Sequence, residues 1–333
     1  MKGALSFLTP RSTAALIICG VALLAAPFVV DRYTLSIILL ALLGTYLGQA
    51  WNILMGYCGL LSLGHALYLG LGAYVSAILF VNYGIGPWLS VFIAMAIAVA
   101  AAFLLGWLGF RFRIEGVYFS LLTIAFAEIV RIGFDNWAFV GGAAGFFLPV
   151  NAALSDQWWN LRGGPLFFYY LALAMAVASL VIAAVLRSSK LGYAFLAIRE
   201  DPQAARALGV NINRTRFLAL FISAAMTAVG GVYTAFWTNN LFPAQILETS
   251  KSIEIILAPI IGGLGTLMGP FVGAFLLVPL GSALTDGLRA IGLSAPGIKA
   301  LVYGLILMAI IAATPNGIWP WIARKLGLEA REQ

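Results

Sequence analysis

The feature of this sequence that most limits its fold is a stretch of 78 residues, 33–110, without a single Asp, Glu, Lys or Arg. A helix needs about 20 mostly apolar residues to cross the hydrocarbon core of a bilayer. Shorter uncharged stretches lie at 12–30, 163–186, 217–247, 255–285 and 300–323. A membrane β-barrel would instead show alternating segments of about 10 residues. The sequence therefore predicts an all-α integral membrane protein.

The composition excludes several classes of protein. Of the 333 residues, 62% are hydrophobic and 9% are charged, whereas a soluble domain has about 45–50% and about 25%. This excludes a soluble enzyme, a nucleic-acid-binding protein and a disordered chain. With two Cys and one His, a disulfide framework or a metal centre is not expected. Nucleophile-elbow and phosphate-loop motifs are absent, so we expect no catalytic residues.

Clusters of Gly, Pro and charge divide the apolar stretches into ten predicted spans. We expect residues 1–333 to form one transmembrane domain, with an outer loop at 135–164 and a cytoplasmic segment at 190–214. The basic, apolar N-terminus is interpreted as a retained first span, because no small-residue cleavage site leads into a soluble domain. The predicted spans are 14–30, 34–54, 59–81, 87–109, 115–134, 165–187, 215–238, 253–269, 271–289 and 298–314.

The distribution of Lys and Arg predicts the orientation. With the N-terminus in the cytoplasm, thirteen of the nineteen basic residues lie on that side, as the positive-inside rule requires. Arg324 and Lys325 are among them, so the number of spans is even and both termini are cytoplasmic. The formal charge of +7 is thus an orientation signal, and we expect a lipid bilayer as partner and no nucleic acid.

Two segments suggest an internal repeat. Residues 62–70 can be laid loosely over residues 266–273, which are one residue shorter. Five predicted spans separate them, so two copies would have opposite orientation, as in the inverted 5+5 repeats of many transporters. Chance similarity between two glycine-rich packing helices is the alternative.

Both regions are rich in helix-breaking residues. Five glycines between 56 and 74 indicate either close helix packing or a broken helix whose backbone groups can bind a polar ligand. Two prolines bracket four glycines at 259–270, which predicts a break or a re-entrant turn.

Few polar residues lie within the predicted spans. His65 suits an interhelical hydrogen bond, because its span offers no ionisable neighbour for a proton relay. Glu128 and Arg131 are spaced i, i+3 and can form an ion pair or line a vestibule. Together with the glycine-rich segments, such polar residues form the predicted substrate pathway: Ser62, Gly64, His65, Gly70, Tyr118, Thr123, Glu128, Gly262, Gly263 and Gly265.

The predicted cytoplasmic segment contains a short helix. Asp201 is a good N-cap, Pro202 suits the first helical position and Gly209 suits the stop, which predicts a helix at 202–208. The small side chains Ala204, Ala205 and Ala207 would offer a smooth surface to another protein. A helix lying on lipid headgroups would need bulkier apolar residues.

Residues 191–211, LGYAFLAIREDPQAARALGVN, closely resemble the coupling loop of branched-chain amino-acid ABC-transporter permeases of the LivM type. Residues 59–74, 115–128, 252–273 and 315–319 match the pattern of that family in the same order. The resemblance covers residues 35–325. Residues 140–145, VGGAAG, depart from the Gly-Gly-Thr-Gly-Gly-like loop of many members.

The resemblance implies a type II ABC-importer-like permease subunit in the bacterial inner membrane, importing leucine, isoleucine and valine. It implies a second, LivH-type permease, two cytoplasmic ATPases that use ATP and Mg, and a periplasmic substrate-binding protein. This chain would bind no cofactor. The residues that would couple it to the ATPases are Arg199, Glu200, Asp201, Pro202, Ala204, Ala205, Arg206 and Gly209.

Two alternatives remain for the function. Related permeases carry urea, short amides or aromatic acids, although residues 207–211 favour the amino-acid branch. An ion-coupled secondary transporter is less favoured, because it would need intramembrane carboxylates at mid-depth.

The topology can be tested by labelling single cysteines in a variant that lacks Cys19 and Cys58. Positions 190–214 and 324–333 should react from the cytoplasm, and positions 140–160 from the periplasm, because of the Lys and Arg asymmetry. Reaction of positions 200 and 150 from the same side would contradict the ten-span topology.

Overall fold

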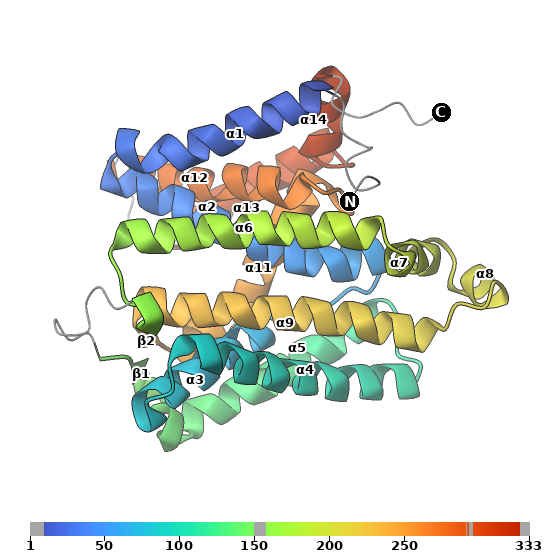
Figure 1. Cartoon of the computed structure of the whole chain (residues 1–333), viewed down its shortest axis with the longest axis horizontal. Helices are drawn as coiled ribbons and strands as arrows, with labels where there is room; N and C mark the ends of the chain where they lie inside the picture. Colours follow the sequence, from blue (N-terminus) through green and yellow to red (C-terminus); the bar gives the residue numbers. More distant parts are fainter. Residues whose placement is uncertain (1–9, 150–157, 291, 293–295, 327–333) are drawn as a thin grey trace. The chain divides into compact units, whose positions relative to one another are not determined.

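The computed structural model describes residues 10–149, 158–290, 292 and 296–326, which form a helical protein with one antiparallel pair of two-residue strands (Figure 1). The chain divides into two compact units. Unit 1 contains residues 1–49, 169–188 and 257–333, and unit 2 contains residues 50–168 and 189–256. The long helices are α1 (Pro10–Val29), α2 (Arg32–Asn52), α3 (His65–Tyr83), α4 (Pro87–Arg111), α5 (Val117–Asn136), α6 (Pro165–Arg187), α9 (Ile212–Thr238), α11 (Thr249–Gly263), α12 (Gly269–Ala290) and α13 (Pro296–Ala313).

The prediction of a multi-pass α-helical protein is confirmed. Each predicted span coincides with one of the ten long helices. Among the described residues, seven helices are long and apolar enough to cross a membrane: α2 with its π-helical extension, α3, α4, α5, α6, α9 and α12. An eighth results if the end of α13 and the short helix α14 (Ile318–Leu326), bent by 48° at their junction, count as one crossing. Length and composition of the described residues therefore identify seven or eight spans, and the full set of ten stays a prediction.

One predicted span has a wrong boundary. The helix expected at 59–81 begins only at His65, and residues 59–64 are not helical. The preceding helix α2 continues instead into a π-helix, η1 (Ile53–Tyr57). Thus the glycine-rich region is a true break in the helical structure, placed before α3.

Unit 2 is built around α3, α4 and α9, which pack side by side (Figure 1). Glycines bring α3 and α9 into backbone contact. A Cβ added at Gly72 would overlap the carbonyl oxygen of Ala228, and one at Gly231 would overlap that of Leu69. Such close approach is typical of membrane helices, where small residues at the interface favour van der Waals packing. The glycines of α3 therefore also serve the packing role.

The two strands of unit 2 lie at one end of it. Strand β1 (Phe146–Phe147) pairs with β2 (Asn240–Leu241), so that Phe146 is opposite Leu241. A short helix, α10 (Pro243–Ile246), follows β2. The described part of the loop between α5 and α6 contains single turns of 3₁₀-helix at η2 (Ala138–Val140), η3 (Gly142–Ala144) and η5 (Trp158–Asn160).

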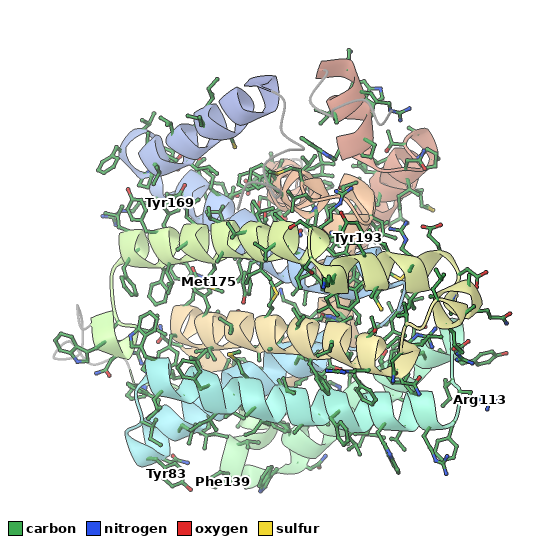
Figure 2. The ribbon with its side chains drawn as sticks, turned by 45° about the vertical axis from the view of Figure 1, so that its right-hand side comes forward. Tyr83, Arg113, Phe139, Tyr169, Met175 and Tyr193 are labelled. Atoms are coloured by element: carbon green, nitrogen blue, oxygen red, sulfur yellow. The ribbon has the colours of Figure 1, made fainter. Side chains whose placement is uncertain are left out.

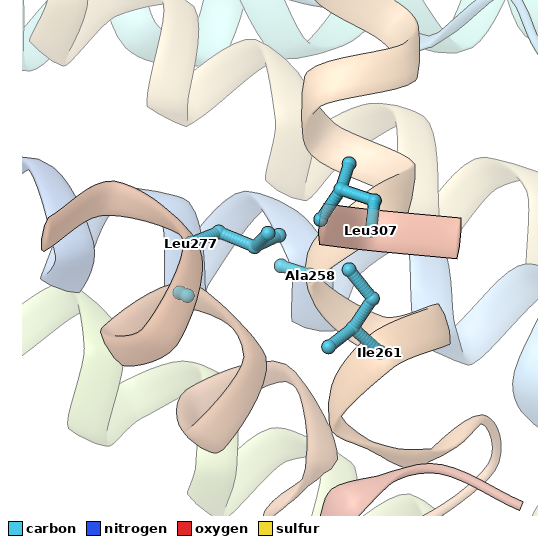
Figure 3. Close-up of a cluster of buried hydrophobic side chains, with 5 residues drawn as sticks. Ala258, Ile261, Leu277 and Leu307 are labelled. Atoms are coloured by element: carbon cyan, nitrogen blue, oxygen red, sulfur yellow. The ribbon is translucent and has the colours of Figure 1, made fainter. Parts of the chain in front are cut away.

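Unit 1 has its own apolar cluster (Figure 3). Ala258 and Ile261 of α11 pack with Ala274 and Leu277 of α12 and with Leu307 of α13. Gly273 allows this approach, because a Cβ there would overlap the carbonyl oxygen of Ala258. The predicted interruption at 259–270 is confirmed, since α11 ends at Gly263 and α12 begins at Gly269.

We expect Gly72→Ala to lower the melting temperature of the purified protein. The added methyl group would force α3 away from α9, at a cost of about 1–3 kcal/mol for overpacking. Gly133→Ala is a matched control, because Gly133 also lies in a helix but has open space at its Cβ position. An equal melting temperature for Gly72→Ala and the wild-type protein would contradict the close α3–α9 contact.

Candidate functional site

The predicted cytoplasmic segment contains a well-capped short helix, α8 (Pro202–Ala207). The carboxylate of Asp201 accepts hydrogen bonds from the backbone N–H of Gln203 at 2.7 Å and of Ala204 at 3.1 Å. Gly209 has a φ of +87°, a left-handed conformation that suits glycine after a helix. Both ends of the predicted helix are therefore formed by the expected residues.

The expectation of one exposed alanine surface is wrong for Ala205. This side chain is 2% exposed, whereas Ala204 and Ala207 are exposed. Successive residues of a helix point about 100° apart, and α8 packs against α7 and α9, so Ala205 faces inward. The exposed face is formed by Ala204, Ala207 and Leu208, of which Leu208 is 82% exposed.

A second helix in this segment, α7 (Lys190–Glu200), was not predicted. The sequence does carry its signals. The hydroxyl of Ser189 caps it by accepting from the N–H of Gly192 at 3.1 Å, and the buried Phe195 and Ile198 share one face. The guanidinium of Arg199, assigned above to ATPase coupling, points back into unit 2 and donates to the carbonyl of Gly56 at 2.6 Å.

Basic residues gather at this end of unit 2. Figure 2 shows Arg113 at the end where α7 carries Tyr193, while Tyr83 lies at the opposite end. Arg216 near the start of α9 forms an ion pair with Glu115 at 2.7 Å, joining α9 to the loop between α4 and α5. That this end faces the cytoplasm stays a prediction.

The break before α3 is held by side-chain hydrogen bonds from other helices. The hydroxyl of Thr123 accepts from the N–H of Leu63 at 3.0 Å, and that of Ser252 accepts from the N–H of Ala66 at 2.8 Å. Trp51 donates its indole N–H to the carbonyl of Ser62 at 2.7 Å. These bonds supply partners for backbone groups that a broken helix leaves unpaired.

Four of the predicted pathway residues meet at this break. Ser62, His65 and Thr123 are completely buried, and a Cβ at Gly64 would lie 2.5 Å from the carbonyl oxygen of Thr123. Nε2 of His65 lies 2.7 Å from the hydroxyl of Ser223 on α9, so the interhelical hydrogen bond expected for His65 is confirmed. Gly70 packs against the side chain of Leu247. The structure brings these residues together as a packed joint.

The other predicted pathway residues lie elsewhere. Tyr118, which is 74% exposed, and Glu128 both belong to α5. Gly262, Gly263 and Gly265 lie in unit 1 at the turn between α11 and α12. In that turn the hydroxyl of Thr266 accepts from the N–H of Gly269 at 3.0 Å, just as hydroxyls cap the start of α3.

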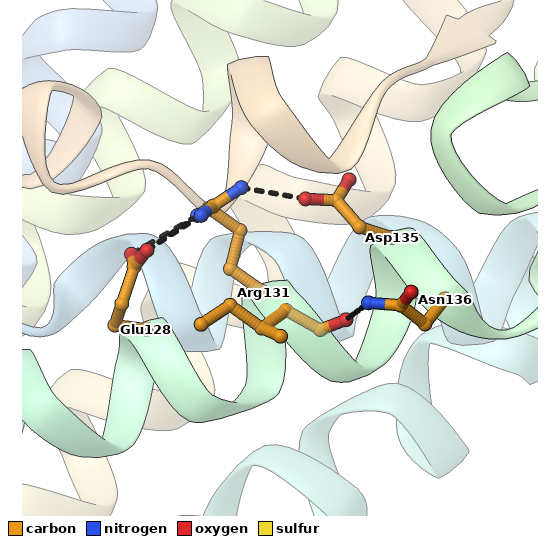
Figure 4. A network of polar contacts seen from close by, with 5 residues as sticks. Glu128, Arg131, Asp135 and Asn136 are labelled. Carbon is orange, nitrogen blue, oxygen red and sulfur yellow. Dashed lines mark hydrogen bonds and ion pairs between the residues drawn. The ribbon is translucent and has the colours of Figure 1, made fainter.

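Helix α5 carries a chain of ion pairs (Figure 4). Arg131 contacts the carboxylate of Glu128 at 2.5 Å and that of Asp135 at 2.5 Å. The expected Glu128–Arg131 pair is confirmed, and Asp135, at i+4 from Arg131, is an addition. Charges within a membrane-spanning helix favour a protein interior or a watery cavity over lipid. This side of α5 is thus suited to a polar pathway.

Arg162, which was not among the predicted site residues, makes several contacts between distant segments of unit 2. Its guanidinium donates to Asn239 Oδ1 and, at 2.9 Å, to the carbonyl of Pro149, and it lies over the rings of Phe80 and Phe236 at 5.5 and 5.7 Å. Burial lowers the pKa of Arg162 from its usual value, and the group still carries its charge. It joins the outer loop to the ends of α3 and α9. Within the described ranges, no three His, Cys, Asp or Glu side chains gather to hold a metal.

Comparison with known proteins places these features in a family. Residues 33–311 match the family described as "Branched-chain amino acid transport system / permease component". The high-affinity branched-chain amino acid transport system permease protein LivM of Escherichia coli K12 is 30% identical over 92% of this chain and 74% of its own length. LivH of the same strain is 24% identical over 80% of this chain and 88% of its own.

A more distant relative matches over a shorter region. The autoinducer 2 import system permease protein LsrC of Enterobacter sp. 638 is 35% identical over 34% of each chain. No solved structure matches.

We expect Thr123→Val to destabilise the protein. Valine has nearly the same shape but leaves the N–H of Leu63 without its acceptor, at a cost of about 1–3 kcal/mol. Thr123→Ser keeps the hydroxyl and serves as the matched control. The melting temperatures of the two purified variants should differ, with Thr123→Ser closer to the wild-type value; the reverse order would contradict the capping role.

Proposed function

The chain belongs to the family of branched-chain amino acid transport system permease components, and on that premise we propose that it is the membrane-spanning subunit of an ATP-driven importer for leucine, isoleucine and valine. The match to LivM over 92% of the chain carries the proposal. The described fold agrees with it, because seven of the described helices are apolar and long enough to span a membrane.

The proposed assembly contains more than this chain. Similarity to both LivM and LivH, two permease proteins of one organism, supports pairing with a second permease of related sequence. Two ATPase subunits would bind and hydrolyse ATP with Mg on the cytoplasmic side, and a periplasmic binding protein would deliver the substrate. We place the chain in the bacterial inner membrane with both termini in the cytoplasm, supported by the asymmetry of its Lys and Arg residues.

The proposed fold is a type II importer-like arrangement of ten spans with an inverted 5+5 repeat. In support, all ten predicted spans coincide with helices. The two similar segments, 62–70 and 266–273, both contain a hydroxyl-bearing residue just before a helix begins, at His65 in unit 2 and at Gly269 in unit 1. In each segment that hydroxyl accepts a hydrogen bond from a backbone N–H. The hydroxyl of Ser62 accepts from Gly64, and the hydroxyl of Thr266 accepts from Gly269.

Helix α8 is the proposed contact with an ATPase. Its exposed face combines small side chains with the apolar Leu208, which is suited to insertion into a groove of a partner protein. ATP-driven closure of the ATPases would move α8 and switch the spans between inward and outward access. The proposed lining of the pathway is formed by α5, with the exposed Tyr118 and the half-buried Glu128–Arg131–Asp135 ion pairs.

The test is uptake into proteoliposomes containing the complete complex, its binding protein and internal ATP. We expect uptake of radiolabelled leucine that isoleucine and valine inhibit. Uptake of urea, a short amide or an aromatic acid without such competition would move the chain to another branch of the family. Uptake driven by an ion gradient without ATP would indicate a secondary transporter.

The same assay tests the contact surface. Ala204→Trp should abolish ATP-driven uptake and co-purification of the ATPase, because the indole would prevent α8 from seating. Ala204→Ser keeps the side chain small and should retain both. Normal co-purification of the ATPase with Ala204→Trp would contradict the proposed contact.

A further inference from the structure

We propose that Arg199 is a positioning residue that links α8 to the helix break before α3, so that movement of α8 reaches the transport helices through residues 56–64. The inference rests on the proposed function, because it concerns how ATP hydrolysis is coupled to transport. It differs from a direct role of Arg199 in binding the ATPase, since the side chain points into unit 2.

The contact between Arg199 and Gly56 is a charge-assisted hydrogen bond at the end of a helix. Nη1 of Arg199 donates to the carbonyl oxygen of Gly56 at 2.6 Å. Gly56 belongs to the π-helix η1, in the last turn before the helical structure ends. Carbonyl groups in the last turn lack intrahelical partners, and a cation there also interacts favourably with the helix dipole. The guanidinium therefore completes the end of this helix with a charge-assisted hydrogen bond.

A second contact fixes the backbone next to this bond. Gly59 has a φ of +72°, which disfavours any residue with a side chain. A Cβ at Gly59 would lie 3.3 Å from both Cα and Cγ of Arg199. Arg199 therefore contacts the break at two points. Its guanidinium binds the carbonyl of Gly56, and its Cα and Cγ pack closely against Gly59.

On the side of α8, the connection is short. Only Glu200 separates Arg199 from Asp201, whose carboxylate caps α8. Helices α7 and α8 are thus joined through one N-cap residue without a loop. A tilt or shift of α8 would displace Arg199 by direct chain connection.

On the side of the transport helices, the segment is also held at several points. Trp51 binds the carbonyl of Ser62, Thr123 binds the N–H of Leu63, and Ser252 binds the N–H of Ala66 at the start of α3. A segment of six non-helical residues anchored in this way cannot absorb a shift at Gly56 without moving its neighbours. Movement at Arg199 would therefore change how α3 sits against α5, α9 and α11.

The experiment compares Arg199→Gln with the wild-type permease in the complete complex. We expect the variant to co-purify with the ATPase and to hydrolyse ATP at the basal rate. Substrate transported per ATP hydrolysed should fall about tenfold, as expected for loss of a hydrogen bond from a charged group. Arg199→Lys, which keeps a charged donor, should restore part of this ratio.

Two further variants separate coupling from general damage. Gly59→Ala should lower the transport-to-ATP ratio as well, and its effect should not add to that of Arg199→Gln, because both disturb one contact. Arg187→Gln removes an exposed arginine at the end of α6 and should leave the ratio unchanged. The melting temperatures of all variants show whether each one folds.

A second readout does not depend on the transported substrate. A cysteine at position 61, in the non-helical segment, should change its labelling rate when ATP binds to the complex. Arg199→Gln should abolish this change. If the wild-type complex shows the change but takes up none of the three amino acids, the substrate assignment fails while the role of Arg199 stands.

Four results would overturn the inference. One is a wild-type transport-to-ATP ratio in Arg199→Gln. Another is loss of ATPase co-purification in that variant, which would make Arg199 part of the contact surface. The third is an ATP-dependent change at position 61 that persists without the arginine. Additive effects of Arg199→Gln and Gly59→Ala would also contradict a shared contact.

Discussion

The structure depends on one constraint: a backbone N–H or C=O within a membrane needs a partner inside the protein. Regular helices satisfy this by themselves, but the break before α3 does not. There the hydroxyls of Thr123 and Ser252 and the indole of Trp51 supply the missing partners. In unit 1, the hydroxyl of Thr266 performs the same task at the start of α12. The break before α3 is therefore also a point where α2, α5 and α11 are connected through side-chain hydrogen bonds.

The same constraint determines where polar side chains lie in unit 2. In unit 2, buried hydroxyls and His65 gather at the break, while the ion pairs of Arg131 lie along α5. Between these sites the helices approach through small residues such as Gly72 and Gly231. Packing by small residues needs no polar groups. The few polar side chains therefore lie at the helix break and along the proposed polar pathway.

These joints matter for an importer driven from outside the membrane. In the proposed complex, the ATPase would contact the cytoplasmic segment, and its motion would have to reach the spans through rigid contacts. Helix α8 has an exposed face for such a partner and a buried residue, Ala205, on the side that rests on the permease. Arg199 then connects this segment to the least regular part of unit 2. The arrangement joins a surface suited to docking to a break that packing alone would hold loosely.

Features that depend on neighbouring residues could be predicted from the sequence. Uncharged stretches located the helices, Asp201 and Gly209 located the ends of α8, and the i, i+3 spacing of Glu128 and Arg131 located an ion pair. Packing between distant segments determines that Ala205 is buried, that residues 59–64 are not helical, and that Arg199 binds Gly56, 143 residues away. Periodicity and capping act within one or two helical turns, whereas these outcomes depend on which distant helices pack together and which unpaired backbone groups their side chains must satisfy.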